Sequence, residues 1–198
     1  TYTALLKIAG EFQINNVLAA LALVHSTGTP LKDIIVKIEA LTEVPGRMQH
    51  AGNSLDGGAV YVDYAHTPDA LKNALTSLKR YVQNKLILVF GCGGNRDPGK
   101  RPEMGAIACQ FADRVIITDD NPRTEDASAI RSSIIKECVN ACEISDRRIA
   151  IEKAIAELEA GDVLLIAGKG HEKGQIIGNE VFPFDDVCIA KAALGEHK

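Results

Sequence analysis

The sequence predicts an α/β fold with an open, mostly parallel sheet and flanking helices. Short apolar runs such as 86–90 have the continuous hydrophobicity of parallel strands that are buried on both faces. These runs alternate with longer stretches that begin at capping residues, as helices do. Four of the runs end in polar loops that carry charged residues. In open parallel sheets, ligands bind at this carboxyl edge of the strands.

The composition excludes several classes of protein. Hydrophobic residues make up 46% of the 198 residues and charged residues 24%, which is typical of a globular protein. Because 22 basic residues face 26 acidic ones without a dense basic run, nucleic acid is not expected as a partner. The longest apolar run, 17–24, is far shorter than the roughly 20 residues that cross a bilayer. We therefore expect no membrane span, and a small charged ligand.

The five cysteines indicate reduced thiols. They show neither Cys-x-x-Cys pairs nor the spacing of zinc ligands. Cys138 and Cys142 are expected to pack as small apolar residues on one helix. No secretory signal pattern opens the chain, and its first residue is not Met. We expect a cytoplasmic protein with no metal ligands in this segment. We also expect the segment to be a piece of a longer chain.

The first 45 residues are predicted to be helical. Two asparagines at 15–16 can cap a helix over 17–24, which stops near Gly28. A Thr-Pro pair at 29–30 is expected to cap and open a second helix over 31–42. Because two helices alone make a poor core, residues 1–45 are interpreted as the end of a preceding domain, with the boundary at Val44-Pro45-Gly46.

Residues 46–198 are predicted to form a second domain of alternating strands and helices. This order predicts a Rossmann-like sheet, wound right-handed. The helices are expected at 68–81, 101–111, 127–142, 147–160 and 186–194. The strands are expected at 49–51, 59–62, 86–90, 114–118 and 162–167, with a terminal hairpin of 175–177 and 181–183.

The loops after the first two long strands offer groups that bind nucleotides and anions. Asp63 can accept hydrogen bonds from ribose hydroxyls and His66 can contact a nucleotide, although both residues can instead brace the following helix. Glycines in 91–99 let backbone amides approach an anion, and Arg96, Lys100 and Arg101 add positive charge. This loop is neither a Walker A loop nor a GxGxxG fingerprint.

The loops after the next two strands offer groups that bind an amino acid. Pro122 fixes a turn in which Asn121 and Arg123 can hold a carboxylate, Arg123 through its bidentate fork, while Asp126 can cap the next helix. Gly168 allows close backbone approach, and Glu172 can pair with an ammonium group. Each loop taken alone can also be an ordinary solvated turn. Together, an arginine for a carboxylate and a glutamate for an amine predict an amino-acid site.

These loops resemble the C-terminal domain of the Mur ligases, the ATP-dependent amide-forming enzymes of peptidoglycan synthesis, and especially the branch that adds meso-diaminopimelate. The helical start, Gly10-Glu11-Phe12 through Asn16, resembles the end of the family's central domain, although Gln13 replaces the usual Asn. The matching strings are Gly46-Arg47-Met48, Asp63-Tyr64-Ala65-His66-Thr67-Pro68, Gly91-Cys92-Gly93-Gly94-Asn95-Arg96-Asp97, Gly99-Lys100-Arg101-Pro102, Asp120-Asn121-Pro122-Arg123 and Gly168-Lys169-Gly170-His171-Glu172.

The resemblance implies two sites. Arg47, Asp63 and His66 match positions that contact ATP, with Asp63 on the ribose. The positions that match the meso-diaminopimelate site are Arg96, Asp120, Asn121, Pro122, Arg123, Gly168 and Glu172. Arg123 is expected to select diaminopimelate over lysine, because lysine lacks the second carboxylate and would leave the guanidinium unpaired.

The resemblance also implies the reaction. ATP would phosphorylate the D-glutamate side chain of UDP-MurNAc-L-Ala-D-Glu, and the amine of diaminopimelate would attack the acyl phosphate, with Mg²⁺ stabilising the phosphoryl charge. The catalytic residues and most metal ligands are expected in upstream domains of the same polypeptide, so this chain alone is expected to be inactive.

Three other interpretations stay open. A lysine-adding or folylpolyglutamate synthase-like ligase is disfavoured by Asn121-Pro122-Arg123. A separate nucleotide-binding or redox module is disfavoured by the missing glycine fingerprint. A purely structural domain would give four charged loops at one sheet edge no purpose.

Overall fold

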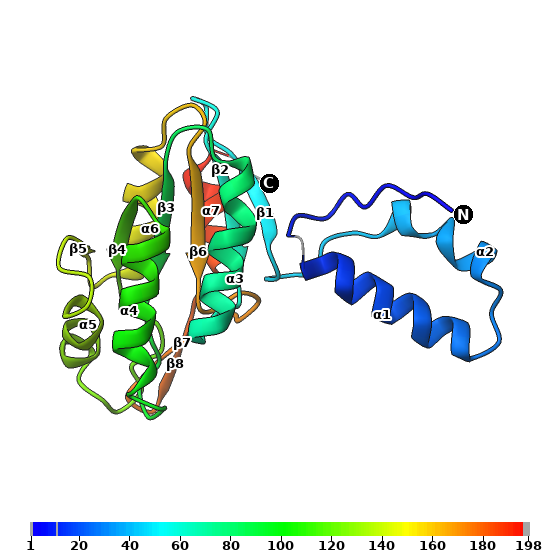
Figure 1. The fold of residues 1–198 in the computed structure, drawn as a ribbon. Helices are drawn as coiled ribbons and strands as arrows, with labels where there is room; N and C mark the ends of the chain where they lie inside the picture. Colours follow the sequence, from blue (N-terminus) through cyan, green and yellow to red (C-terminus); the bar gives the residue numbers. More distant parts are fainter. Residues whose placement is uncertain (1, 11, 196–198) are drawn as a thin grey trace.

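The structure is a computed structural model that describes residues 2–10 and 12–195. Its main sheet has six strands in the order β1-β2-β6-β3-β4-β5 (Figure 1). All neighbours are parallel except β1, which pairs antiparallel with β2. The α/β fold class is therefore confirmed. The strands are β1 (Gln49–Asn53), β2 (Ala59–Asp63), β3 (Leu86–Phe90), β4 (Arg114–Ile117), β5 (Cys142–Glu143) and β6 (Val163–Ala167).

Helices cover both faces of this sheet, as Figure 1 shows. The apolar core is correspondingly divided into two clusters. One contains residues of α3 (Pro68–Leu78), α4 (Lys100–Phe111) and α5 (Ala127–Ile135), and the other contains residues of α6 (Arg147–Ala156) and α7 (Asp186–Ala193). A short hairpin of β7 (Gly174–Ile177) and β8 (Glu180–Pro183) and a 3₁₀ turn at Lys79–Tyr81 complete this part.

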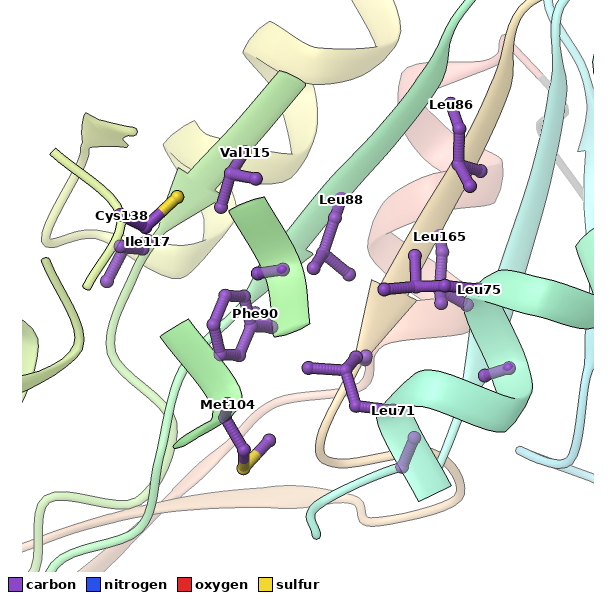
Figure 2. Close-up of a cluster of buried hydrophobic side chains, with 14 of the residues drawn as sticks. Leu71, Leu75, Leu86, Leu88, Phe90, Met104, Val115, Ile117, Cys138 and Leu165 are labelled. Atoms are coloured by element: carbon purple, nitrogen blue, oxygen red, sulfur yellow. The ribbon is translucent and has the colours of Figure 1, made fainter. Parts of the chain in front are cut away.

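Strand β3 shows why a continuous apolar run lies at the centre. Leu86, Leu88 and Phe90 belong to the first cluster, which Figure 2 shows around Phe90 and Met104. Ile87 and Val89 belong to the second cluster. Because successive side chains of a strand point to opposite faces, every position of β3 is buried and must be apolar.

Capping side chains set the start of the helices beside the site. Thr67 accepts a hydrogen bond from the Ala70 backbone N–H, and Pro68 follows in the first turn of α3. Asp126 accepts from the Ser128 backbone N–H at the start of α5, as predicted. Both residues satisfy backbone donors that lack a partner within the helix.

The helices before the sheet differ from the prediction. Helix α1 (Phe12–Ser26) begins before the two asparagines, and Asn16 donates to the Gln13 side chain from inside the helix. Half-buried Phe12 packs against the first core cluster, which favours the earlier start. Helix α2 (Leu31–Ile35) ends early and is followed by a 3₁₀ turn at Ile38–Ala40. Since α2 buries no residue, little packing supports a longer helix.

Three further predictions about where helices begin or end were wrong. Pro30 occupies the capping position of α2 without a side-chain hydrogen bond, so Thr29 is not the cap. Helix α5 ends at Ile135, and Cys142 pairs with Ile116 in β5, because the open edge of β4 provides strand partners. Buried Cys138 therefore packs in the core beyond the helix. Helix α6 ends at Ala156, ahead of the turn at Gly161, where φ is +81°.

The helical segment α1–α2 lies to one side of the sheet in Figure 1. A domain boundary at residues 44–46 stays a prediction. None of the helices in the described residues has the length and apolar character needed to cross a membrane.

Candidate functional site

The four charged loops meet in one pocket. Strands β2, β6, β3 and β4 are parallel neighbours, so the loops that follow them lie at the same edge of the sheet. The pocket between them has a volume of about 500 Å³. The residues that line it are Tyr64, His66, Thr67, Gly93, Arg96, Asp97, Lys100, Asp120, Asn121, Arg123, Gly168 and Glu172.

Arg123 is anchored by its backbone and by part of its side chain. Its N–H donates to the Ile176 carbonyl oxygen at 3.0 Å, and its own carbonyl oxygen accepts from Gly178 at 2.7 Å. Nη1 donates to the carbonyl oxygen of Gly94 at 2.8 Å. Nε and Nη2 make no hydrogen bond with the described residues. The Nε–Nη2 edge of the fork is therefore available for a carboxylate.

The backbone of Arg123 is in the left-handed region, with φ of +53°. This conformation is uncommon for a residue with a side chain, and strained residues of this kind concentrate at functional sites. The preceding Pro122 is buried, and its carbonyl oxygen accepts a hydrogen bond from Glu125 at 3.2 Å. Pro122 itself does not line the pocket and shapes the turn that presents Arg123.

Asn121 and Glu172 are joined behind the pocket by a lysine. The Asn121 Nδ2 atom donates to Glu172 Oε2 at 2.9 Å. Lys169 Nζ donates to Asn121 Oδ1 at 2.9 Å and lies 3.3 Å from Glu172 Oε2. The Lys169 side chain is fully buried, whereas that of Glu172 is 35% exposed. Glu172 therefore lines the pocket with its position fixed by two partners.

Asp120 is the most deeply buried carboxylate of the pocket. It is 8% exposed, and its carboxylate makes no hydrogen bond with the described residues. Burial raises its pKa above the usual range for an aspartate, while the cations of Arg147 and Lys169 act in the opposite direction. Gly168 lets the backbone pass close to this carboxylate, because a Cβ there would lie 2.7 Å from Asp120 Oδ2.

The three cations of the second loop have different roles. Arg96 is exposed and lines the pocket, and Lys100 lines it while donating to the His66 carbonyl oxygen at 2.9 Å. Arg101 does not line the pocket: it is buried and pairs with both oxygens of Glu125, at 3.0 and 2.9 Å. The backbone N–H of Asn95, followed by Arg101, lowers the pKa of Glu125. Arg101 thus holds the second and third loops together.

The residues expected to contact ATP lie beside the pocket, and only His66 lines it. Asp63 is buried and accepts from the Met48 N–H at 2.7 Å and the Ala65 N–H at 2.8 Å. Burial raises the pKa of Asp63, although both hydrogen bonds oppose that shift. The exposed Arg47 guanidinium lies 4.7 Å from the centre of the Tyr64 ring. Asp63 therefore braces the loop, which is the alternative interpretation of this residue.

Seven residues predicted to bind ligands line this pocket: Arg96, Asp120, Asn121, Arg123, Gly168, Glu172 and His66, the last of which was predicted to contact ATP. Their roles stay predictions. Lys100 and the glycines of 91–99 were predicted to bind an anion, and Lys100 and Gly93 line the pocket as well. No ligand-binding role was predicted for the lining residues Tyr64, Thr67 and Asp97, nor for Lys169. A lysine between two glycines is the one sequence signal that pointed to Lys169.

The described residues contain no group of three or more His, Cys, Asp or Glu side chains that could hold a metal ion. The charged side chains that line the pocket are the carboxylates of Asp97, Asp120 and Glu172 and the cations of Arg96, Lys100 and Arg123.

Comparison with known proteins settles the family. Residues 46–170, more than half of the chain, match the family model described as "Mur ligase, glutamate ligase domain". The chain belongs to the Mur ligase family. The resemblance expected from the loop motifs is thereby confirmed, and the parallel sheet with its flanking helices is the fold of a Mur ligase domain.

Curated Mur ligases from two bacteria are similar to almost the whole chain. The "UDP-N-acetylmuramoyl-L-alanyl-D-glutamate--2,6-diaminopimelate ligase" of Bradyrhizobium diazoefficiens is 51% identical over 193 residues, which is 98% of this chain and 40% of the relative. The protein of the same name from Mesorhizobium japonicum is 50% identical over 191 residues, with 96% and 40% covered. The chain thus spans about 40% of the length of these curated relatives.

Solved structures of this family are similar in fold as well. The structure of a UDP-N-acetylmuramoyl-L-alanyl-D-glutamate--2,6-diaminopimelate ligase has a TM-score of 0.75 and 41% identity, covering 98% of this chain and 40% of that one. A folylpolyglutamate synthase from Thermotoga maritima has a TM-score of 0.63 and 26% identity, covering 85% of this chain and 38% of that one.

Proposed function

We propose that this chain is the part of a diaminopimelate-adding Mur ligase that binds the incoming amino acid and part of ATP. The observation that carries the proposal is the pocket at the sheet edge, which is lined by three carboxylate and three cationic side chains. An amino acid with two carboxylates and two amines needs both kinds of partner. The names of relatives about 50% identical over nearly the whole chain support this substrate.

In this proposal the two ends of the substrate bind different loops. The free Nε–Nη2 edge of Arg123 pairs with the far carboxylate of meso-diaminopimelate, and exposed Arg96 adds a second cation. Asp120 and Glu172 receive an ammonium group, for which Gly168 leaves room, and Asn121 holds Glu172 in place through its Nδ2 atom. L-lysine would leave the Arg123 edge without a partner, which costs about 1–3 kcal/mol and gives the selectivity.

The nucleotide is assigned to the neighbouring surface formed by Arg47, Asp63 and His66. The Arg47 guanidinium lies 4.7 Å from the centre of the Tyr64 ring, and the His66 ring contacts Tyr64 edge-on with ring centres 4.5 Å apart. A nucleobase can stack on planar and cationic groups of this kind. Asp63 holds the loop through one N–H per oxygen, and each of its oxygens retains a lone pair for a ribose hydroxyl.

The chemistry assigned to the whole enzyme is amide formation through an acyl phosphate. ATP transfers its terminal phosphoryl group to the D-glutamate side-chain carboxylate of UDP-MurNAc-L-Ala-D-Glu, and ADP leaves. The amine of diaminopimelate then attacks the carbonyl carbon of this acyl phosphate, and inorganic phosphate and a proton leave. Mg²⁺ stabilises the phosphoryl charge when it is bound. Because the chain spans about 40% of the length of its curated relatives, the metal, the catalytic residues and the sugar-nucleotide site are assigned to upstream domains.

The same proposal assigns the two parts of the chain to domains of the ligase. Residues 1–45 are the end of the central domain of the ligase, and residues 46–198 are its C-terminal domain. The reaction consumes ATP, so the enzyme works in the cytoplasm. Without the upstream domains this chain is expected to bind ligands and to form no amide bond.

A substrate test separates the proposal from its alternatives. The full-length enzyme is incubated with ATP, Mg²⁺, UDP-MurNAc-L-Ala-D-Glu and either meso-diaminopimelate or L-lysine, and the product is identified by mass spectrometry. We expect incorporation of meso-diaminopimelate only. Incorporation of L-lysine at an equal rate would assign the chain to another Mur ligase branch.

A further inference from the structure

The buried lysine behind the pocket has no role in the function proposed above. Lys169 lies between Gly168 and Gly170, whose φ angles of +115° and +53° turn the loop sharply on both sides. These turns place its side chain inside the protein with no exposed surface, and it does not line the pocket. A buried ammonium group is costly unless it is paired, so its partners indicate what it does.

Those partners are two residues of the amino-acid pocket. Nζ donates to Asn121 Oδ1 at 2.9 Å and lies 3.3 Å from Glu172 Oε2. The Ile176 backbone N–H, 3.0 Å away, donates to the same Asn121 oxygen. With two donors on its oxygen, the Asn121 amide has one favourable orientation, in which Nδ2 points to Glu172 Oε2 at 2.9 Å.

Glu172 is held through one oxygen and is free at the other. Oε2 receives both Asn121 Nδ2 and Lys169 Nζ, whereas Oε1 makes no hydrogen bond with the described residues. The side chain is 35% exposed, and it belongs to the pocket lining. Without its ion pair this partly exposed carboxylate would be free to turn toward water.

We propose that Lys169 is a positioning residue of the amino-acid pocket, which fixes Asn121 and Glu172 for the ammonium group of the substrate without touching it. This inference rests on the proposed function of the pocket. The inferred role of Lys169 is to hold these two side chains in position, and not to supply charge to the pocket. If Lys169 acted through charge alone, its removal would make the pocket more negative and strengthen binding of an ammonium group.

The test compares Michaelis constants in the full-length enzyme. For Lys169→Met we expect KM for meso-diaminopimelate to rise about tenfold or more, which is the loss of one charge-assisted hydrogen bond, and KM for ATP to change less than about twofold. Lys169→Gln retains a donor and is expected to fall between Lys169→Met and the wild type. The matched control is Lys173→Met, which removes an 80% exposed lysine of the same loop that pairs with Asp185. It is expected to leave both constants unchanged.

A double variant keeps the test valid if Lys169→Met folds poorly. Lys169→Met/Glu172→Gln removes both members of the ion pair and so leaves no buried charge without a partner. Because Lys169 acts partly through Glu172, KM for meso-diaminopimelate in the double variant should be clearly lower than the product of the two single effects predicts. The inference would be overturned if the effects of the two single variants on KM for meso-diaminopimelate simply multiplied in the double variant. It would also be overturned if Lys169→Met raised KM for ATP equally, or if Lys169→Met bound the amino acid more tightly.

The same experiment separates this inference from the proposed function. If the wild-type enzyme prefers another amino acid and Lys169→Met raises KM for that amino acid alone, the proposed substrate is wrong and the positioning role of Lys169 stands. If the wild type is specific for meso-diaminopimelate and Lys169→Met has the same two Michaelis constants as Lys173→Met, the proposed substrate stands and the positioning role of Lys169 is wrong.

Discussion

The Nη1 atom of Arg123 donates to the carbonyl oxygen of Gly94 over 2.8 Å and so ties the loop after β4 to the loop after β3. The backbone N–H of Gly94 in turn donates to the Asn121 carbonyl oxygen at 2.9 Å. A Cβ on Gly94 would overlap with the Pro122 carbonyl oxygen, so the two loops can approach this closely only because residue 94 is glycine. The guanidinium that faces the pocket is therefore held in place before a ligand arrives.

Replacing Arg123 by lysine should weaken diaminopimelate binding selectively. A lysine supplies a point charge and cannot both hold Gly94 and pair with a carboxylate through two parallel bonds. We expect the Kd for meso-diaminopimelate to rise about tenfold or more, and the Kd for ATP to change little, in calorimetric titrations. Arg148→Lys, an exposed arginine paired with Glu152, is the control. Equal losses for both ligands would remove Arg123 from the amino-acid pocket.

Gly168→Ala should impair the pocket beyond its effect on stability. The new Cβ would lie 2.7 Å from Asp120 Oδ2, and the φ of +115° adds backbone strain. Gly28→Ala is a matched control, because Gly28 has a φ of +97° and a Cβ added there would meet no atom within 4 Å. Both variants should lose about 1 kcal/mol from strain, and only Gly168→Ala should also lose diaminopimelate affinity. An equal affinity in the two variants would contradict the close approach of Gly168 to Asp120.

Asp120→Asn should change the pH dependence of stability. Because burial raises the pKa of Asp120, the folded state binds more protons than the unfolded state between the unfolded value of about 3.9 and the folded pKa. The wild type therefore loses stability from this residue as pH rises through that window. The free energy of unfolding of Asp120→Asn, relative to wild type, should be highest at pH 7 and decline toward pH 4, while diaminopimelate binding is weakened.

Asp126→Asn provides a control with the opposite sign. The Ser128 N–H at the start of α5 lowers the pKa of Asp126, so its charge stabilises the fold above the unfolded pKa and that contribution is lost as pH falls. Urea unfolding at several pH values should show Asp126→Asn less stable than wild type at pH 7 and equal to it in acid. A flat difference for Asp120→Asn would mean that its carboxyl group is not perturbed by burial.

Loss of one member of the buried Arg147–Asp186 pair should destabilise the fold strongly. Arg147 donates through Nε and Nη2 to the two oxygens of Asp186, at 2.8 and 2.7 Å, and neither side chain is exposed. Arg147→Met should reduce the free energy of unfolding by about 3–5 kcal/mol, because it leaves a buried charge unpaired. Arg147→Met/Asp186→Leu should lose less than that single variant in urea unfolding.

The exposed Lys85–Glu159 pair is the reference for this measurement. Its side chains are 50% and 66% exposed, so Lys85→Met should cost less than about 1 kcal/mol. If Arg147→Met reduced the free energy of unfolding no more than Lys85→Met does, the buried Arg147–Asp186 pair would not be stabilising the starts of α6 and α7.

Local sequence patterns predicted most of the fold. The strand at 86–90 was predicted to the residue because five apolar side chains are needed where both faces of a strand are covered. The Thr67-Pro68 start of α3 was equally clear, since its capping chemistry is local. Strand β5 was missed because its two residues carry no pattern: they become a strand only through pairing with β4.

The site was predictable to the level of its loops and not of its contacts. Arg123 and Glu172 were singled out because both follow strands, where an arginine can hold a carboxylate and a glutamate an ammonium group, and both line the pocket. Lys169 was not, because lysines are rarely fully buried and its partner Asn121 is distant in sequence. Asp63 was predicted to bind a ribose. Its hydrogen bonds with the backbone N–H groups of Met48 and Ala65 were not predicted, because they depend on how the chain enters β1.

The most direct test of the central claim is calorimetric titration of the full-length protein with meso-diaminopimelate and, in parallel, with L-lysine. The two amino acids differ at the carboxylate that Arg123 is proposed to bind. The account predicts saturable heat with meso-diaminopimelate and at least about tenfold weaker binding of L-lysine. Equal affinities for the two amino acids would show that the pocket at the carboxyl edge does not recognise that carboxylate.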